Sequence, residues 1–78
     1  MEKRKLELNR PYKHFKGKIY YVHFLTENTE TGEKEVVYQA LYPPYIMSSR
    51  PYDMFMSEVD KEKYPNVEQK YRFELWEG

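Results

Sequence analysis

The distribution of apolar and polar positions along the chain predicts short strands joined by polar turns. Residues 18–26 and 36–42 are dense in β-branched and aromatic side chains, which is typical of strands. The polar residues 27–35 lie between them and predict the tip of a hairpin. Residues 69–76 alternate large apolar with charged side chains, and residues 45–49 are a shorter candidate. The pattern therefore predicts at least four strands.

One short segment favours a helix. Residues 51–57 predict a single helical or 3₁₀ segment, because Pro51 suits the first helical turn and Asp53 interacts favourably with the positive end of a helix. Met54 and Phe55 are expected to turn toward the core. The chain is thus expected to be β-rich with one helical turn.

These elements predict a mainly β fold in a single small domain of residues 10–76. The first choice is a small antiparallel SH3-like barrel of four to five strands with one short helical turn, since closure hides the strand edges of an aromatic chain. The alternative is a small α+β sheet with one helix packed across it. Residues 1–9 form a basic N-terminal arm that either extends as an edge strand or frays.

Composition adds that the core must be thin and aromatic. Nine Tyr, four Phe and one Trp make up 18% of the 78 residues. A tyrosine ring can be buried while its hydroxyl stays in water, so such a core can support a folded domain. The absence of cysteine excludes a disulfide scaffold.

The chain shows neither the long apolar run of a transmembrane helix nor the apolar core of a signal peptide. We therefore expect a cytoplasmic protein without a membrane role.

Charge is balanced overall but not along the chain. The 13 basic and 13 acidic side chains cancel, which argues against a general attraction to nucleic acid or anionic membrane. Residues 1–18 carry seven basic and two acidic side chains, a local balance of +5. The basic end is either a solvated arm or a phosphate-binding arm.

The first candidate site is the run His14-Phe15-Lys16-Gly17. An imidazole, a ring and a cation beside a glycine are suited to binding phosphate or stacking on a base. The structural alternative is the start of a strand, with Phe15 in the core and Gly17 in the turn.

The second candidate is Arg50, followed by Pro51. An arginine held by a proline and a short helix presents a fixed fork for a carboxylate or a phosphate. The alternative is an internal salt bridge, for example with Asp53.

Two further candidates are weaker. Glu30 lies in a Glu-Thr-Gly-Glu run that offers carboxylates to a metal or a basic partner, or simply forms a soluble hairpin turn. The nine tyrosines cannot all be central in so small a core, so some, with Tyr38 and Tyr42 as candidates, are expected at a half-exposed binding face or at the rim of the sheet.

Several short motifs occur in order along the chain. They are His-Phe-Lys-Gly at 14–17, Glu-Thr-Gly-Glu at 30–33, the strand at 36–42, and Arg50-Pro51 followed by Met54-Phe55. With residues 58–65 and 70–73, this order resembles domain of unknown function 1653, a family of small, mostly bacterial proteins, over about residues 10–76. The resemblance implies a single domain and no known chemistry.

Two positions depart from the family pattern. The family usually has an aromatic-Val pair before the Arg-Pro, where this chain has Ser48-Ser49, and a glycine after the Leu-Tyr, where this chain has Pro43-Pro44. The loop after Tyr42 is therefore expected to have a different shape, with one aromatic fewer to line a pocket.

The sequence favours a non-catalytic binding or adaptor module, with protein–protein association, including self-association, as the lead hypothesis. The expected ligand-binding residues are Arg50, Pro51, His14, Phe15, Lys16, Tyr38, Tyr42 and Glu30. The alternative is binding of RNA or single-stranded nucleic acid by a small barrel. A minor hydrolase or ligand-processing role comes third, because we identify no catalytic set, no metal site and no cofactor motif.

Overall fold

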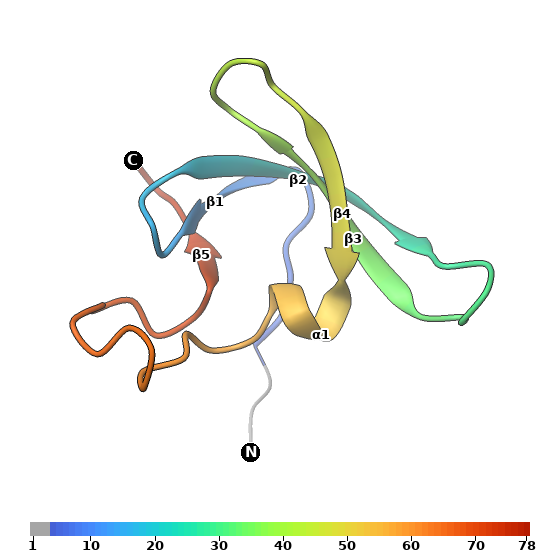
Figure 1. Cartoon of the computed structure of the whole chain (residues 1–78). Helices are drawn as coiled ribbons and strands as arrows, with labels where there is room; N and C mark the ends of the chain where they lie inside the picture. The colour runs from blue at the N-terminus through green and yellow to red at the C-terminus, as the bar shows by residue number, and fades with distance from the viewer. Residues whose placement is uncertain (1–3) are drawn as a thin grey trace.

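A computed structural model describes residues 4–78 of the chain as one antiparallel sheet with one short helix (Figure 1). The sheet has five strands in the order β4-β3-β2-β1-β5. The elements are β1 (Arg10–His14), β2 (Ile19–Glu27), β3 (Lys34–Ala40), β4 (Met47–Pro51), α1 (Tyr52–Phe55) and β5 (Phe73–Leu75). Within the described residues, no helix has the length and apolar character needed to cross a membrane.

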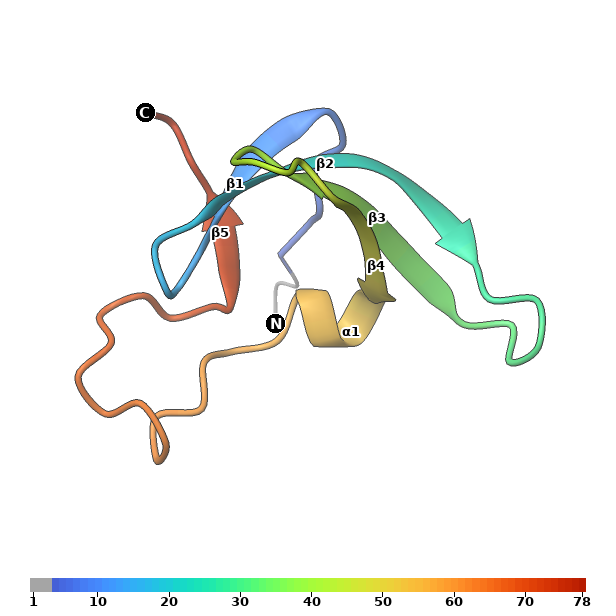
Figure 2. The same cartoon turned by 45° about the horizontal axis from the view of Figure 1, so that its top comes forward.

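The sheet is open, so the predicted closure into an SH3-like barrel is wrong. Strands β4 and β5 stand at opposite edges and do not pair with each other. Figure 2 shows the sheet arching over α1, with the chain from α1 to β5 running as an irregular loop on the side away from β4. Because β5 has only three residues and α1 fills the space beneath the arch, the two edges do not meet.

The central hairpin follows the sequence pattern. Strands β2 and β3 confirm the predicted pair with bounds shifted by one or two residues, and the turn between them is the polar segment 28–33. A bulge between Val22 and Phe24 inserts one residue, so Phe24 emerges on the outer face of the sheet. Strand β4 is displaced two residues from its predicted place, and β5 is shorter than predicted.

Strand β1 was not predicted, although it lies inside the sheet between β2 and β5. Its Arg10-Pro11 pair suggests a break, because proline cannot donate to a ladder. Here Pro11 still uses its carbonyl oxygen, which accepts from the N–H of Trp76 at 3.0 Å, just past the end of β5. The missing N–H therefore costs the sheet little.

The concave side of the sheet closes on a small aromatic core. Its central contact is the stack of Phe55 from α1 on Phe73 from β5, with ring centroids 4.0 Å apart and planes 7° from parallel. Tyr38 approaches both rings, at 5.3 and 5.6 Å. The buried cluster consists of Tyr12, Val22, Val36, Tyr38, Phe55 and Phe73. Phe55 faces the core as predicted, whereas Met54 does not: it is 47% exposed, because a single helical turn buries one face only.

The described part of the N-terminal arm packs on the domain. Arg4 donates to the carbonyl oxygen of Phe73 at 2.8 Å, and its guanidinium lies 3.9 Å from the ring centre of Tyr71. Leu6 packs against the core cluster. The first three residues of the predicted arm lie outside the described residues.

We expect Phe73→Ala to lower the free energy of unfolding by about 3–5 kcal/mol, because it removes the ring on which Phe55 stacks and leaves a cavity. A domain of this length has only about 4–12 kcal/mol in total. Urea denaturation followed by circular dichroism measures the change. Phe24→Ala is the matched control, since that ring is 52% exposed, and its effect is expected to be much smaller. Equal losses in the two variants would contradict this account of the core.

Candidate functional site

A cavity of about 370 Å³ opens where the β1–β2 turn meets β4 and the loop before β5. Four of the residues predicted from the sequence line it, although they come from distant parts of the chain. The lining residues are His14, Phe15, Lys16, Arg50, Val59, Asp60, Lys63, Tyr64 and Arg72. The fold therefore joins the first two sequence candidates, the run around His14 and the Arg50 turn, into one site.

His14 is held as a neutral ring at the base of this cavity. Its Nδ1 accepts a hydrogen bond from the backbone N–H of Lys16 at 3.1 Å, which leaves the proton of the neutral ring on Nε2. The ring stacks on Phe15 at 4.5 Å and meets the edge of Phe73 at 4.9 Å. Burial, and then the positive charges of Arg50, Arg72 and Lys16, lower the pKa of His14 from 6.5 to about 4.

Two arginines border the cavity without an acidic partner. Arg50 donates from Nε to the hydroxyl of Tyr38 at 3.2 Å, and Arg72 has a buried Nε with no hydrogen-bond partner. In residues 4–78 the one ion pair joins Arg10 to Glu7 on the surface. The internal salt bridge between Arg50 and Asp53 is therefore not formed. The charge of Arg72 is therefore partly desolvated and has no ion-pair partner within residues 4–78.

One wall of the cavity is aromatic and carries further cations. The rings of Phe15 and Tyr64 lie 5.0 Å apart. The ammonium group of Lys16 lies 5.6 Å from the centre of the Tyr64 ring, and that of Lys63 lies 5.7 Å from it. The acid in the lining, Asp60, accepts hydrogen bonds from the backbone N–H groups of residues 62 and 63, so it organises its own turn.

A second hollow of about 290 Å³ shares Arg50 with the first. It contains Tyr38 and Tyr42, so the predicted tyrosines lie on the other side of that arginine. The hydroxyls of Tyr20 and Tyr42 are 2.7 Å apart. Burial, followed by this hydrogen bond, raises the pKa of Tyr20 to about 12, so the Tyr20 hydroxyl stays protonated and neutral near pH 7. The two hollows form one concave face that is cationic at one end and phenolic at the other.

Two predicted residues lie apart from this face. Glu30 sits at the tip of the β2–β3 hairpin, where its N–H donates to the side chain of Asn28 at 2.9 Å. Pro51 borders a different hollow of about 610 Å³, which includes Lys34 and Asp53. Neither residue faces His14 or Arg72.

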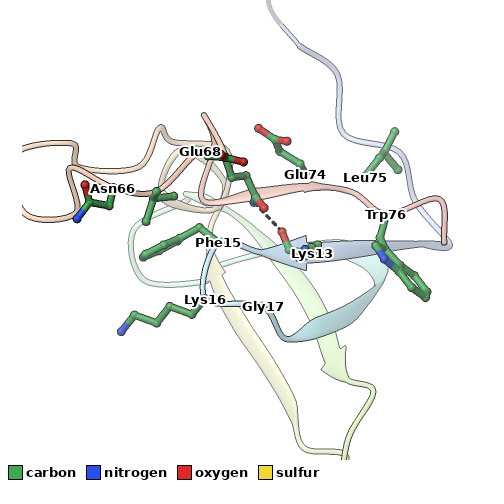
Figure 3. A pocket seen from close by; sticks show the side chains of 11 residues that line it. Lys13, Phe15, Lys16, Gly17, Asn66, Glu68, Glu74, Leu75 and Trp76 are labelled. Atoms are coloured by element: carbon green, nitrogen blue, oxygen red, sulfur yellow. Dashed lines mark hydrogen bonds between the residues drawn. The ribbon is translucent and has the colours of Figure 1, made fainter.

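The widest hollow, about 690 Å³, lies on the other side of Phe15 and Lys16 (Figure 3). Two of its polar side chains, Gln69 and Glu74, are already used within the fold. Gln69 donates to the carbonyl of Lys13 at 2.9 Å, and the carboxylate of Glu74 accepts two backbone N–H groups. In Figure 3 the Lys16 side chain extends away from this space. We therefore interpret this hollow as the place where the loop before β5 packs against the edge of the sheet.

Sequence reasoning missed Arg72, Lys63 and Tyr64. Arg72 is one of the charged residues that alternate with apolar ones over 69–76, and this pattern gives it no role. A signal for the other two was present, because Lys63-Tyr64 is a basic and aromatic doublet like Phe15-Lys16. No local pattern in the sequence indicates that the two doublets lie side by side, because about fifty residues separate them along the chain.

Comparisons with known proteins agree on one family. The model of the family described as protein of unknown function (DUF1653) matches residues 10–75. A crystal structure of a DUF1653 protein from Bordetella bronchiseptica is similar, with a TM-score of 0.71 and 31% sequence identity over 85% of this chain and 82% of that chain. No curated protein matches. The family resemblance drawn from the sequence motifs is confirmed.

The lowered pKa of His14 predicts a pH dependence of stability. Between about 6.5 and about 4 the unfolded chain binds a proton at this imidazole and the folded chain does not, so the free energy of unfolding falls as the pH drops through that range. Urea denaturation at pH about 7 and about 5 is expected to show a smaller drop for His14→Gln than for the wild type. His23→Gln, which leaves His14 in place, should keep the wild-type drop; an unchanged drop in His14→Gln would contradict the assignment.

Proposed function

The chain belongs to the DUF1653 family of proteins of unknown function, and from this premise we propose that it is a binding module whose concave cavity receives an acidic segment of a partner protein. The observation that carries the proposal is the pair of arginines, Arg50 and Arg72, which line one cavity and form no ion pair within residues 4–78.

The charges in the cavity favour an anion. Lys16, Arg50, Lys63 and Arg72 are cationic there, and Asp60 supplies one negative charge. His14 is neutral near pH 7 because its pKa is about 4, so it adds a hydrogen-bond donor on Nε2 without adding charge. A carboxylate entering the cavity would meet a net positive field and guanidinium groups that can donate charge-assisted hydrogen bonds.

The arrangement suits a partner that presents few charges at one place. The cations surround a single hollow of about 370 Å³, and the whole chain has no net charge. A nucleic-acid ligand draws its affinity from many phosphates along a track, whereas a carboxylate pair needs one well-built fork. This contrast supports a protein partner as the first choice.

The test uses an acetyl-capped tetraglutamate peptide as the probe, titrated into labelled protein and followed by amide NMR. We expect shifts at residues 14–16 and 72. We also expect the pKa of His14 to rise on binding, because an anion nearby favours the imidazolium form. Arg72→Gln is expected to weaken binding about tenfold or more, as a charge-assisted hydrogen bond is lost.

Arg10→Gln is the matched control for this test. It removes the same charge from an exposed site whose partner is Glu7, so peptide affinity should stay close to that of the wild type. Equal weakening in both variants would show only general charge attraction. Shifts that map away from residues 14–16 and 72 would also contradict the proposal.

A second candidate, binding of single-stranded nucleic acid, has one observation in its favour. The rings of Phe15 and Tyr64 lie close together and offer a surface on which bases can stack. The ammonium groups of Lys16 and Lys63 lie near the Tyr64 ring and can bind the phosphates of a nucleic acid. An oligouridine titration at two salt concentrations discriminates between the candidates. Tight binding that falls steeply with salt, together with weak tetraglutamate binding, would favour this candidate over the first.

A further inference from the structure

The outer edge of β4 carries backbone groups that the sheet does not use. Ala40 donates to the carbonyl of Ile46, and β3 and β4 continue in that antiparallel register. Hydrogen-bonded pairs alternate along such a ladder, so residues 46, 48 and 50 turn their N–H and C=O toward β3. Met47 and Ser49 therefore turn theirs outward, and no turn or loop hydrogen bond of the described chain involves them.

The opposite edge of the sheet is shorter and partly occupied. Strand β5 has three residues, whereas β4 has five. The outward carbonyl of Phe73 accepts from the guanidinium of Arg4 at 2.8 Å. A partner within the chain competes with pairing to another strand. The contrast makes β4 the better edge for a further strand.

Exposed apolar side chains lie directly beside the open edge. Tyr45, Ile46 and Met47 are each about half exposed, at 53%, 58% and 48%. Leu41 at the end of β3 is 46% exposed. Apolar surface of this kind on the flank of a free edge adds contact area to backbone pairing.

We propose that two copies of the chain associate through their β4 strands, antiparallel and centred on Ser48, to form one continuous sheet across the dimer. This inference does not rest on the proposed function: it uses the backbone at the rim of the sheet and leaves His14 and Arg72 outside the contact, and Arg50 is the one residue that lies in both regions.

The choice of a second copy rests on self-complementarity. With the two-fold axis at Ser48, Met47 of one copy pairs with Ser49 of the other, and the N–H and C=O of both residues are all used. Pairing centred on Ser49 would set the carbonyl of Met47 against Pro51, which has no N–H. The Ser48 register also places Arg50 opposite Ile46 of the other copy, so no like charges meet across the strands.

The apolar flank supports the same occupant. In the Ser48 register, residues 45–47 of each copy run beside residues 49–51 of the other, so both copies' exposed apolar groups lie against the new strand pair. Four hydrogen bonds alone make a weak contact, and the two apolar flanks add buried apolar area to it.

Sedimentation velocity from micromolar to millimolar concentration is the first measurement, and we expect a monomer–dimer equilibrium. Ser49→Pro removes an outward N–H without touching the β3–β4 ladder, so it is expected to raise the dimer dissociation constant about tenfold or more. An amide NMR spectrum of the variant verifies that the fold is kept. Arg72→Gln, which alters the cavity and not the edge, should dimerise like the wild type.

A charge exchange tests the register if Ser49→Pro fails to fold. Met47→Lys alone should weaken the dimer, since a lysine at a free edge opposes strand addition. The double variant with Ser49→Glu should restore it, because lysine and glutamate face each other twice in the Ser48 register. A monomer at all concentrations overturns the proposal. The proposal is also overturned if a dimer forms and neither Ser49→Pro nor Met47→Lys weakens it. If the double variant does not restore the dimer, the Ser48 register is wrong.

Discussion

The stack of Phe55 on Phe73 is the contact on which the rest of this fold depends. It joins the single helical turn to the last strand across the hollow of an open sheet, at a ring separation of 4.0 Å. In a closed barrel, strand pairing would bring the two ends of the sheet together. Here the contact between the rings of Phe55 and Phe73 connects the two ends of the sheet, and the ring of Tyr38 packs against both. A chain with so little aliphatic content can hold such a sheet because each aromatic ring buries a large area.

The same stack also shapes the candidate site. The Phe73 ring meets the edge of His14 at 4.9 Å and lies 5.9 Å from the guanidinium of Arg50. The apolar core therefore ends where the cationic cavity begins, and one ring belongs to both. This placement explains why His14 resists protonation: it is buried against the core on one side and faces arginines on the other.

The sequence predicted local features of the fold far better than long-range ones. The β2–β3 hairpin and the short helix followed from side-chain patterns and turn residues that act over a few positions. The open sheet did not, because whether β4 meets β5 depends on the length of β5 and on what Phe55 fills. For the site, His14 and Arg50 were selected for their chemistry, whereas Arg72 looked like an ordinary solvated residue until β5 placed it beside them. Glu30 lies apart from the cavity, at a hairpin tip where its backbone N–H bonds the side chain of Asn28.

The pairing of β1 with β5 has a consequence for the order of folding. His14 and Phe73 are partners in this ladder, although they are 59 positions apart in the sequence. Strands β2, β3 and β4 are joined by short turns and close small loops. The β1–β5 pair closes a loop of about three-quarters of the chain, which costs more entropy and slows its formation. We therefore expect the hairpins to form early and β5 to dock late. Because the cavity lies across that last junction, it is completed only when folding is, and an anion bound there would retard unfolding from the β5 end.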